Sequence, residues 1–165
     1  MLFQLSTSDF LKDIPLKSCA FTGHRTLREG FDEKNLKNAV LALIERGVDT
    51  FYNGMAKGFD LLAAETVLSF KDKYPSVKLI ACIPYYGQEK NYLEEDKKRY
   101  LTILNGADQK IILSDRYYKG CMHERNNYMA YRADVLVAYL KEEKGGTAST
   151  VKYFKRKKNA VIFID

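Results

Sequence analysis

The chain has 165 residues, which suits one domain, and its 46% hydrophobic and 29% charged residues support a sizeable core and exclude a disordered chain. The net charge of +6 is compatible with nucleic acid or with an anionic small ligand and does not decide between them. The apolar runs are too short to cross a bilayer, and the first residues lack the basic leader and long apolar stretch of a secretory signal, so we expect a cytoplasmic protein without a membrane partner.

From Ser18 to the end, apolar β-type runs alternate with helical patterns. We predict strands at 18–22, 49–53, 77–83, 110–113, 134–140 and 160–164, separated by helices at about 32–47, 59–74, 89–104, 121–132 and 145–158. Strands joined by crossover helices predict a single α/β, Rossmann-like three-layer domain with a mostly parallel, doubly wound sheet. This domain covers residues 18–165, and residues 1–17 are expected to form an N-terminal extension packed against its outside.

Single residues set several of these boundaries. Asp32 can cap the first helix with its side chain, and Gly47 is a natural stop. The helix from residue 59 must end before Pro75, because the residue preceding a proline disfavours helical backbone. The strand predicted at 134–140 is continuously apolar after Asp134, as in a strand buried on both faces of a parallel sheet. The charged helix at 89–104 should turn Leu93, Tyr100 and Leu104 toward the core.

The three cysteines are odd in number and have no C-x-x-C spacing, so they imply no disulfide framework. Cys19 and Cys82 lie in apolar runs and are expected in the core. Cys121, His123 and Glu124 could be grouped as metal ligands, but zinc sites normally gather three or four ligands and no second cluster completes this one. No metal site is predicted.

Three glycine-containing loops follow predicted strands, at the edge where doubly wound sheets bind ligands. They are Thr22-Gly23-His24-Arg25, the stretch from Asn53 to Asp60, and Gly145-Gly146-Thr147. Glycine lets a backbone approach a ligand closely, and a helix N-terminus presents free N–H groups to an anion. Glycine after a strand is usually only a turn residue, but three such loops at one edge favour a shared pocket for a phosphate-bearing ligand. The predicted cradle consists of Gly23, Gly54, Gly58, Gly145, Gly146 and Thr147, with charge supplied by Arg25 and Lys57.

Other polar residues near these loops each have two interpretations. Asp60 could bond a ribose hydroxyl or a ligand amine, or it could only cap its helix. Glu65 is either a pocket carboxylate or an exposed residue. His24 lies in a loop, which favours ligand contact over core packing. Arg125 and Asn126 could reach the pocket from the helix at 121–132, and a surface ion pair is the alternative for Arg125.

Aromatic and basic residues outside the glycine loops suggest two further contacts. Tyr85 and Tyr86 follow the third strand and could stack on a base, although tyrosines in loops often only shield the core. The last helix ends in a basic cluster that favours solvent exposure and is also compatible with an anionic partner. This cluster consists of Lys152, Lys155, Arg156, Lys157 and Lys158. Neither a Walker A loop nor a G-x-G-x-x-G fingerprint is present, so ordinary ATP or NAD chemistry is disfavoured.

The chain contains, in this order, the motifs Thr22-Gly23-His24-Arg25, Asn53-Gly54-x-x-x-Gly58-Phe59-Asp60, Glu124-Arg125-Asn126 and Gly145-Gly146-Thr147. In order and spacing, this set resembles the YpsA-like branch of the SLOG superfamily. The resemblance covers nearly the whole chain after residue 17. It implies a Rossmann-like fold and the binding of nucleotides, nucleotide-sugars or related ligands, often by a sensor. For this branch the resemblance supplies no defined reaction.

The LOG branch of the same superfamily cleaves cytokinin riboside monophosphates at the N-glycosidic bond, and its motif resembles P-G-G-x-G-T-x-x-E. Aligning the paired glycines places Lys152 at the glutamate, and a cation cannot act as the general acid or base at neutral pH. We therefore expect a binding or sensing domain that needs no cofactor, with a nucleotide or nucleotide-sugar as ligand and a homo-oligomer possible. The enzymatic alternative is an N-glycoside hydrolase using Asp60 or Glu65. Single-stranded DNA binding through the basic helix, resembling DprA, is the third alternative.

Overall fold

The computed structural model describes residues 15–157 and 159–165. Within these residues, six strands and five α-helices alternate, with one 3₁₀ turn. Their bounds are β1 (Ser18–Gly23), α1 (Glu33–Glu45), β2 (Thr50–Asn53), α2 (Phe59–Ser69), β3 (Lys78–Ile83), η2 (Gln88–Asn91), α3 (Glu94–Gly106), β4 (Gln109–Ile112), α4 (Cys121–Arg132), β5 (Val135–Tyr139), α5 (Gly146–Arg156) and β6 (Ala160–Phe163). Most of the predicted N-terminal extension, residues 1–14, lies outside the described residues, and so does Lys158.

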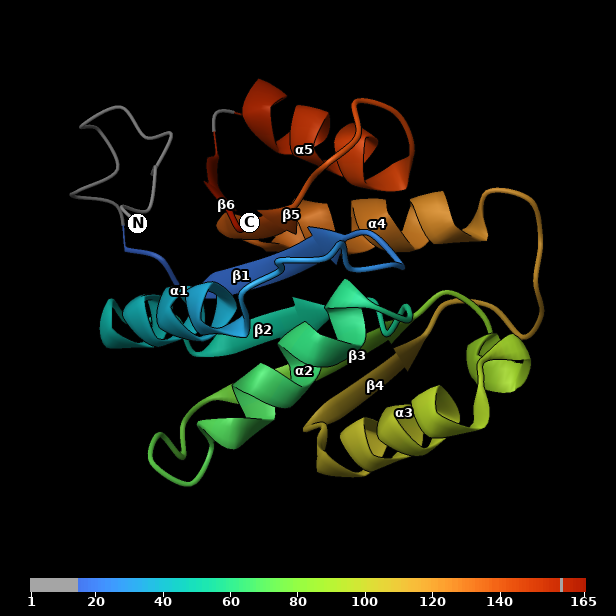
Figure 1. Cartoon of the computed structure of the whole chain (residues 1–165), viewed down its shortest axis with the longest axis horizontal. Helices are drawn as coiled ribbons and strands as arrows, with labels where there is room; N and C mark the ends of the chain where they lie inside the picture. The colour runs from blue at the N-terminus through green and yellow to red at the C-terminus, as the bar shows by residue number, and fades with distance from the viewer. Residues whose placement is uncertain (1–14, 158) are drawn as a thin grey trace.

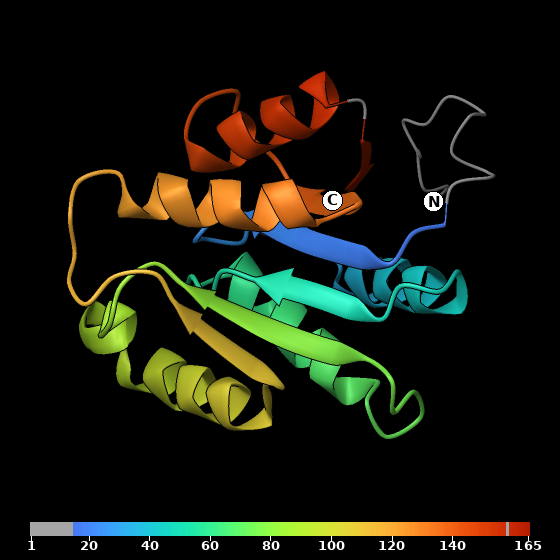
Figure 2. The ribbon, with the colours of Figure 1, turned by 180° about the vertical axis from the view of Figure 1, so that it is seen from behind.

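All six strands are parallel, in the order β4-β3-β2-β1-β5-β6. Helices α1, α2 and α3 cover one face of the sheet, and α4 and α5 cover the other (Figures 1 and 2). The chain steps outward from β1 to β4, and α4 then carries it back so that β5 pairs with the other side of β1. Strand order therefore reverses between β1 and β5, and the predicted doubly wound architecture is confirmed.

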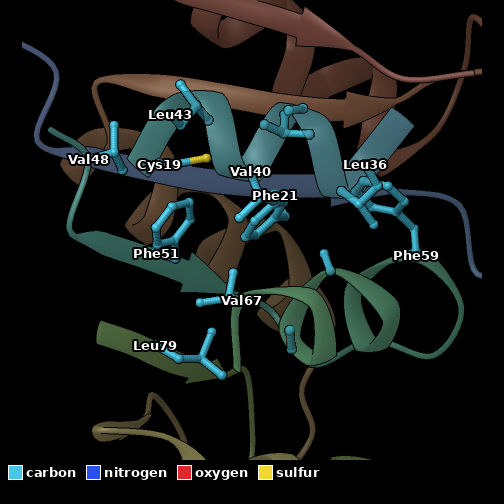
Figure 3. Packing of buried hydrophobic residues seen from close by; sticks show 14 of the residues in the cluster. Cys19, Phe21, Leu36, Val40, Leu43, Val48, Phe51, Phe59, Val67 and Leu79 are labelled. Carbon is cyan, nitrogen blue, oxygen red and sulfur yellow. The ribbon is translucent and has the colours of Figure 1, made fainter. Parts of the chain in front are cut away.

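Two hydrophobic cores hold the layers together. The core beneath α1, α2 and α3 is rich in aromatic rings, and Phe21 stacks on Phe51 with their centroids 5.9 Å apart. Figure 3 shows these two rings between α1 and the sheet, with Phe59 beside them and Cys19 also buried there. The core beneath α4 and α5 uses smaller side chains and includes Cys82. The prediction that Cys19 and Cys82 are core residues is confirmed.

Local signals in the sequence account for several element ends. The Asp32 carboxylate accepts a hydrogen bond from the Lys34 N–H at 2.9 Å and caps α1 as predicted. Gly47 follows the C-cap of α1 with φ of 102°, the left-handed conformation that favours glycine. Strand β5 is buried at every position, as its continuous apolar run indicated. Among the described residues, no helix combines the length and apolar character that crossing a membrane would need.

The structure corrects two predicted helices. Helix α2 ends at Ser69 instead of Tyr74, and the chain continues through a turn in which the Tyr74 N–H still bonds the Phe70 carbonyl at 2.9 Å. The predicted helix at 89–104 is divided into η2 and α3. Leu93 is the N-cap of α3 and is 77% exposed, so its assignment to the apolar side was wrong. The acidic first turn of α3 explains this start, because negative charge is favoured at a helix N-terminus.

Candidate functional site

A cleft of about 360 Å³ opens at the carboxyl end of β1, next to the strand-order reversal. It is formed by the loops after β1 and β2 together with the N-terminal parts of α4 and α5. Its lining contains eight of the predicted site residues, which are Gly23, His24, Arg25, Asp60, Arg125, Asn126, Gly146 and Thr147. Thus segments more than 120 residues apart in the chain meet at one edge of the sheet.

Asp60 lies in the first turn of α2, where its side chain lines the cleft and is only 5% exposed. One carboxylate oxygen, Oδ2, accepts a hydrogen bond from the Ala56 N–H at 3.3 Å. The other, Oδ1, is buried and has no hydrogen-bond partner among the described residues. Burial raises the pKa of Asp60 to about 6, although the nearby charges of Arg125 and Arg25 act in the opposite direction. Oδ1 is therefore a buried acceptor that a ligand could satisfy.

Arg125 is a buried cation on the α4 side of the cleft. Its Nη1 donates to the carbonyls of Gly54 and, at 3.5 Å, of Cys82, and its Nε donates to Asn126 Oδ1 at 2.8 Å. In the described part of the chain, its Nη2 has only the Met122 thioether at 4.0 Å, which is a weak acceptor. Burial lowers the pKa of the guanidinium, and the Asp60 charge opposes that shift. Arg125 therefore adds positive charge to the lining, and the surface ion pair is not observed.

The loop after β1 supplies His24 and Arg25. The His24 Nε2 accepts a hydrogen bond from the Lys141 N–H at 2.8 Å, and the ring packs edge-to-face on Tyr139 at 5.8 Å between centroids. Because Nε2 is the acceptor, the proton of the neutral imidazole belongs on Nδ1. His24 is thus fixed in orientation by the chain itself, whereas Arg25 is exposed at the cleft.

The N-terminus of α5 faces the same cleft through Gly146 and Thr147. No side chain caps this helix, whose N-cap is Gly145, and its first internal backbone bond runs from the Ser149 N–H to the Gly145 carbonyl at 3.0 Å. The preceding N–H groups at residues 146–148 belong to the helix end, where backbone donors and the helix dipole favour an anion. A Cβ at Gly146 would meet the Asn126 side-chain nitrogen at 3.6 Å, so this amide lies beside the helix end.

Three of the predicted cradle glycines have a packing role. A Cβ on Gly23 would overlap the Phe59 ring, and one on Gly54 would lie 2.7 Å from the Arg125 guanidinium carbon. A Cβ on Gly58, whose φ is 80°, would overlap the backbone carbonyl of Arg25. These glycines let the loops after β1 and β2 and the side chain of Arg125 pack closely. Of the three, Gly23 also lines the cleft, whereas Gly54 and Gly58 do not.

The other predicted residues do not line the cleft. Lys57 is exposed and Gly145 is the N-cap of α5, and neither contributes to the lining. Glu65 of α2 forms a bidentate ion pair with Arg99 of α3, at 2.7 and 2.9 Å. Its carboxylate is therefore engaged elsewhere.

The loop between β2 and α2 is held in an unusual conformation. Met55 is buried and has φ of 59°, which is uncommon for a residue other than glycine. The Asn53 side chain accepts from the Met55 N–H at 2.8 Å and donates to the Asp60 carbonyl at 2.7 Å, and the Tyr92 hydroxyl donates to the Met55 carbonyl at 3.0 Å. This network positions Asp60 before any ligand arrives. Neither the conformation of Met55 nor the Tyr92 contact could be inferred from a pattern in the sequence.

Hydrogen bonds to the Gly54 carbonyl oxygen hold the Arg125 side chain in place. This oxygen accepts from Arg125 and also from the Gln88 side-chain amide of η2 at 3.1 Å. The Gln88 amide oxygen in turn accepts from the buried Tyr100 hydroxyl at 3.3 Å. Arg125 is consequently anchored to the segment that follows β3.

Comparison with known proteins agrees with this organisation. Residues 28–163 match the family model YpsA, which is described as the YspA SLOG family. The chain belongs to this family. A UPF0398 protein of Halalkalibacterium halodurans is 34% identical over 119 residues, which cover 71% of this chain and 63% of the relative. The UPF0398 protein YpsA of Bacillus subtilis is 27% identical over 144 residues, or 80% of each chain.

Solved structures similar to this YpsA-family chain include two DNA processing proteins A. The protein from Streptococcus pneumoniae has a TM-score of 0.64 and 21% identity, covering 93% of this chain and 50% of that one. The Helicobacter pylori protein, described for its single-stranded DNA binding mode, has a TM-score of 0.63 and 19% identity, covering 94% and 67%. At these identities the likeness is one of fold.

The remaining groups noted in the sequence lie elsewhere. Within residues 15–157 and 159–165, no three His, Cys, Asp or Glu side chains are grouped so that they could hold a metal ion. Tyr85 and Tyr86 line a separate groove, and Lys152 lies in a hollow between α4 and α5. Met122 and Ala56 line the cleft and were not predicted, because neither residue type carries a chemical signal.

Proposed function

We propose that the cleft of this YpsA-family protein binds a nucleotide-derived small molecule. The phosphate would lie at the N-terminus of α5, beside the Asn126 amide and near Arg25, and a sugar hydroxyl would donate to Asp60. The observation that carries the proposal is the buried, unpartnered Oδ1 of Asp60 in the same cleft as an uncapped helix N-terminus. A ligand with both a hydroxyl donor and an anion satisfies both features at once.

Size and charge also support this class of ligand. A volume of about 360 Å³ lies at the lower end of small-molecule sites and suits a nucleotide or part of a nucleotide-sugar. Arg25 and Arg125 contribute two positive charges to the lining against the one carboxylate of Asp60. An anion is therefore favoured on entering the cleft, and the helix end strengthens that preference.

The proposal is tested by calorimetric titration with AMP, ADP, ADP-ribose and UDP-glucose, together with native mass spectrometry of protein purified without added nucleotide. Asp60→Asn should weaken the best ligand at least about ten-fold, because the carboxylate accepts a charge-assisted hydrogen bond. Gly146→Asp should abolish binding, because a carboxylate at the helix end repels the phosphate and occupies its place.

Glu65→Gln is the matched control, since it changes a carboxylate on the same helix that does not line the cleft and is paired with Arg99. Its affinity should equal that of the wild type. Unchanged affinity in both Asp60→Asn and Gly146→Asp would place the ligand elsewhere. Failure of every compound to bind, with no co-purifying mass, would remove the proposal altogether.

One observation also supports hydrolysis of an N-glycosidic bond as a second candidate. A buried carboxyl with a pKa of about 6 can exchange a proton near neutral pH, which a general acid or base requires. Glu65 is held by Arg99, so within this candidate function the role belongs to Asp60. Long incubation with nucleoside monophosphates, followed by chromatography, tests it. Release of free base that is lost in Asp60→Asn supports hydrolysis, and absence of release leaves the cleft as a binding or sensing site.

A further inference from the structure

A second hollow, which we call the tyrosine groove, lies at the carboxyl ends of β3 and β4. It has a volume of about 600 Å³ and shares no lining residue with the cleft. Its lining includes Tyr85, Tyr86, Lys90, Asn91, Arg116 and Tyr117. These residues come from two segments, the one between β3 and α3 and the one between β4 and α4, which run beside each other in both views of the molecule (Figures 1 and 2).

Two of the rings in the tyrosine groove are presented to solvent. Tyr86 is 66% exposed and Tyr117 is 62% exposed, whereas tyrosines such as Tyr100 are fully buried in the core. Tyr85 packs its ring edge-to-face against Tyr117 with the centroids 5.4 Å apart. The groove therefore offers two tyrosine rings that are each more than half exposed to solvent.

The backbone beneath these rings is ordered by hydrogen bonds. The Tyr86 N–H donates to the Ser114 carbonyl at 2.9 Å and ties the two segments together. The Ser114 hydroxyl donates to the Arg116 carbonyl at 2.7 Å and accepts from the Arg116 N–H at 3.3 Å. Because these bonds fix the backbone, the segments lose less conformational entropy when a partner stacks on the rings.

Charge and composition indicate what kind of partner fits. Lys90 Nζ lies 5.8 Å from the centre of the Tyr86 ring, and Arg116 also lines the groove. These two cations outnumber the single carboxylate of Asp115. Aromatic faces flanked by cations are how proteins bind single-stranded nucleic acid without sequence preference.

We propose that the tyrosine groove binds single-stranded nucleic acid, with two bases stacked on Tyr86 and Tyr117 and phosphates beside Lys90 and Arg116. The two rings favour a strand over a mononucleotide, because each ring can take one base. The inference rests on the groove alone and is independent of what binds in the cleft.

The test is fluorescence anisotropy of a labelled oligothymidylate of about ten nucleotides, a length within the range of known single-strand sites. Tyr86→Ala and Tyr117→Ala should each weaken binding about five-fold or more, because each removes one stacked base. Lys90→Gln and Arg116→Gln should each reduce the slope of log affinity against log salt by about 0.7, the value for one phosphate contact on a single strand. All four side chains lie at the surface of the groove, so circular dichroism and thermal midpoints should be unchanged.

Tyr131→Ala is the matched control, since Tyr131 is 73% exposed on α4 outside the groove and lies near Lys157 of the basic cluster. It should bind the oligonucleotide like the wild type, as should Gly146→Asp in the cleft. Equal losses in Tyr131→Ala or in Lys155→Gln would move the strand to α5 and overturn the inference. A loss in Gly146→Asp would move it to the cleft, with the same consequence. No binding at low salt, as expected if the groove holds a protein instead, also overturns it.

Discussion

Asp60→Asn is expected to stabilise the protein without ligand at neutral pH, although the same change weakens ligand binding. Burial raises the pKa of Asp60 from an ordinary value of 3.8 to about 6, because its ionised form loses water and its Oδ1 gains no hydrogen bond. A pKa difference of this size corresponds to about 3 kcal/mol of unfolding free energy. The asparagine has no charge to bury, and its amide oxygen can still accept from the Ala56 N–H. Removing the charge also deprives the buried Arg125 of the attraction of Asp60, which offsets part of this gain. We therefore expect a net gain of about 1–3 kcal/mol.

The pH dependence of this gain has a definite sign. The folded state holds the Asp60 proton more tightly than the unfolded chain, because the folded pKa is the higher one. The wild type therefore loses stability as the pH rises from about 4 through about 6, and the full loss persists above that range. Below about pH 4 the carboxyl is protonated in both states and contributes nothing to the difference. The advantage of Asp60→Asn should grow from near zero to its full value across this window.

Urea unfolding followed by far-ultraviolet circular dichroism measures the effect, since the chain contains no tryptophan. Glu65→Gln serves as control, because the Glu65 carboxylate is half-exposed and paired with Arg99. Its loss should lower stability by at most about 1 kcal/mol at neutral pH. An Asp60→Asn variant that is less stable than the wild type at neutral pH, or whose advantage does not change with pH, would refute the reasoning.

Three further measurements separate buried from exposed positions. Gly58→Ala should destabilise the fold by at least about 1 kcal/mol more than Gly120→Ala. Both glycines have positive φ, but only a Cβ at Gly58 overlaps backbone atoms. Equal urea midpoints of the two variants would contradict this prediction. Ile103→Ala should lower the free energy of unfolding by about 2–4 kcal/mol, and Leu93→Ala by less than about 0.5 kcal/mol. The reason is that Ile103 is buried and Leu93 is exposed, and thermal unfolding of the two variants measures the difference. Burial raises the pKa of the Cys82 thiol to about 12, so iodoacetamide at neutral pH should label this residue only after unfolding. Rapid labelling of Cys82 in the native protein would show that this thiol is not buried.

The fold was predictable because its signals are local. Strand β5 is a continuous apolar run and α1 has a capping aspartate and a stopping glycine, so each can be recognised from a few adjacent residues. The sequence failed where distant contacts decide, as in the segment that divides into η2 and α3. There Gln88 and Tyr92 bond the loop after β2, which no periodicity along the helix could indicate.

The candidate site shows the same division. The topology of a doubly wound sheet brings the ends of β1 and β2 and the start of α5 to one edge, so the glycine loops could be placed from the sequence. The partner of each side chain could not. Glu65 pairs with Arg99, which lies 34 positions away, and Gly58 makes room for the backbone of Arg25. Whether the cleft residues contact a ligand stays a prediction for the titrations above.

The shared acceptor at Gly54 limits how freely this protein can vary. Its carbonyl oxygen accepts hydrogen bonds from both the Arg125 guanidinium and the Gln88 side-chain amide. Gln88 directly follows Gly87, in the same turn that carries the exposed Tyr86 and Lys90. An engineered chimera or a homologue can carry a different turn here and still keep every residue of the cleft. Such an exchange will shift the Gly54 carbonyl oxygen to which Arg125 donates. Transplanting the cleft onto another Rossmann-like scaffold therefore requires the segment after β3 to move with it.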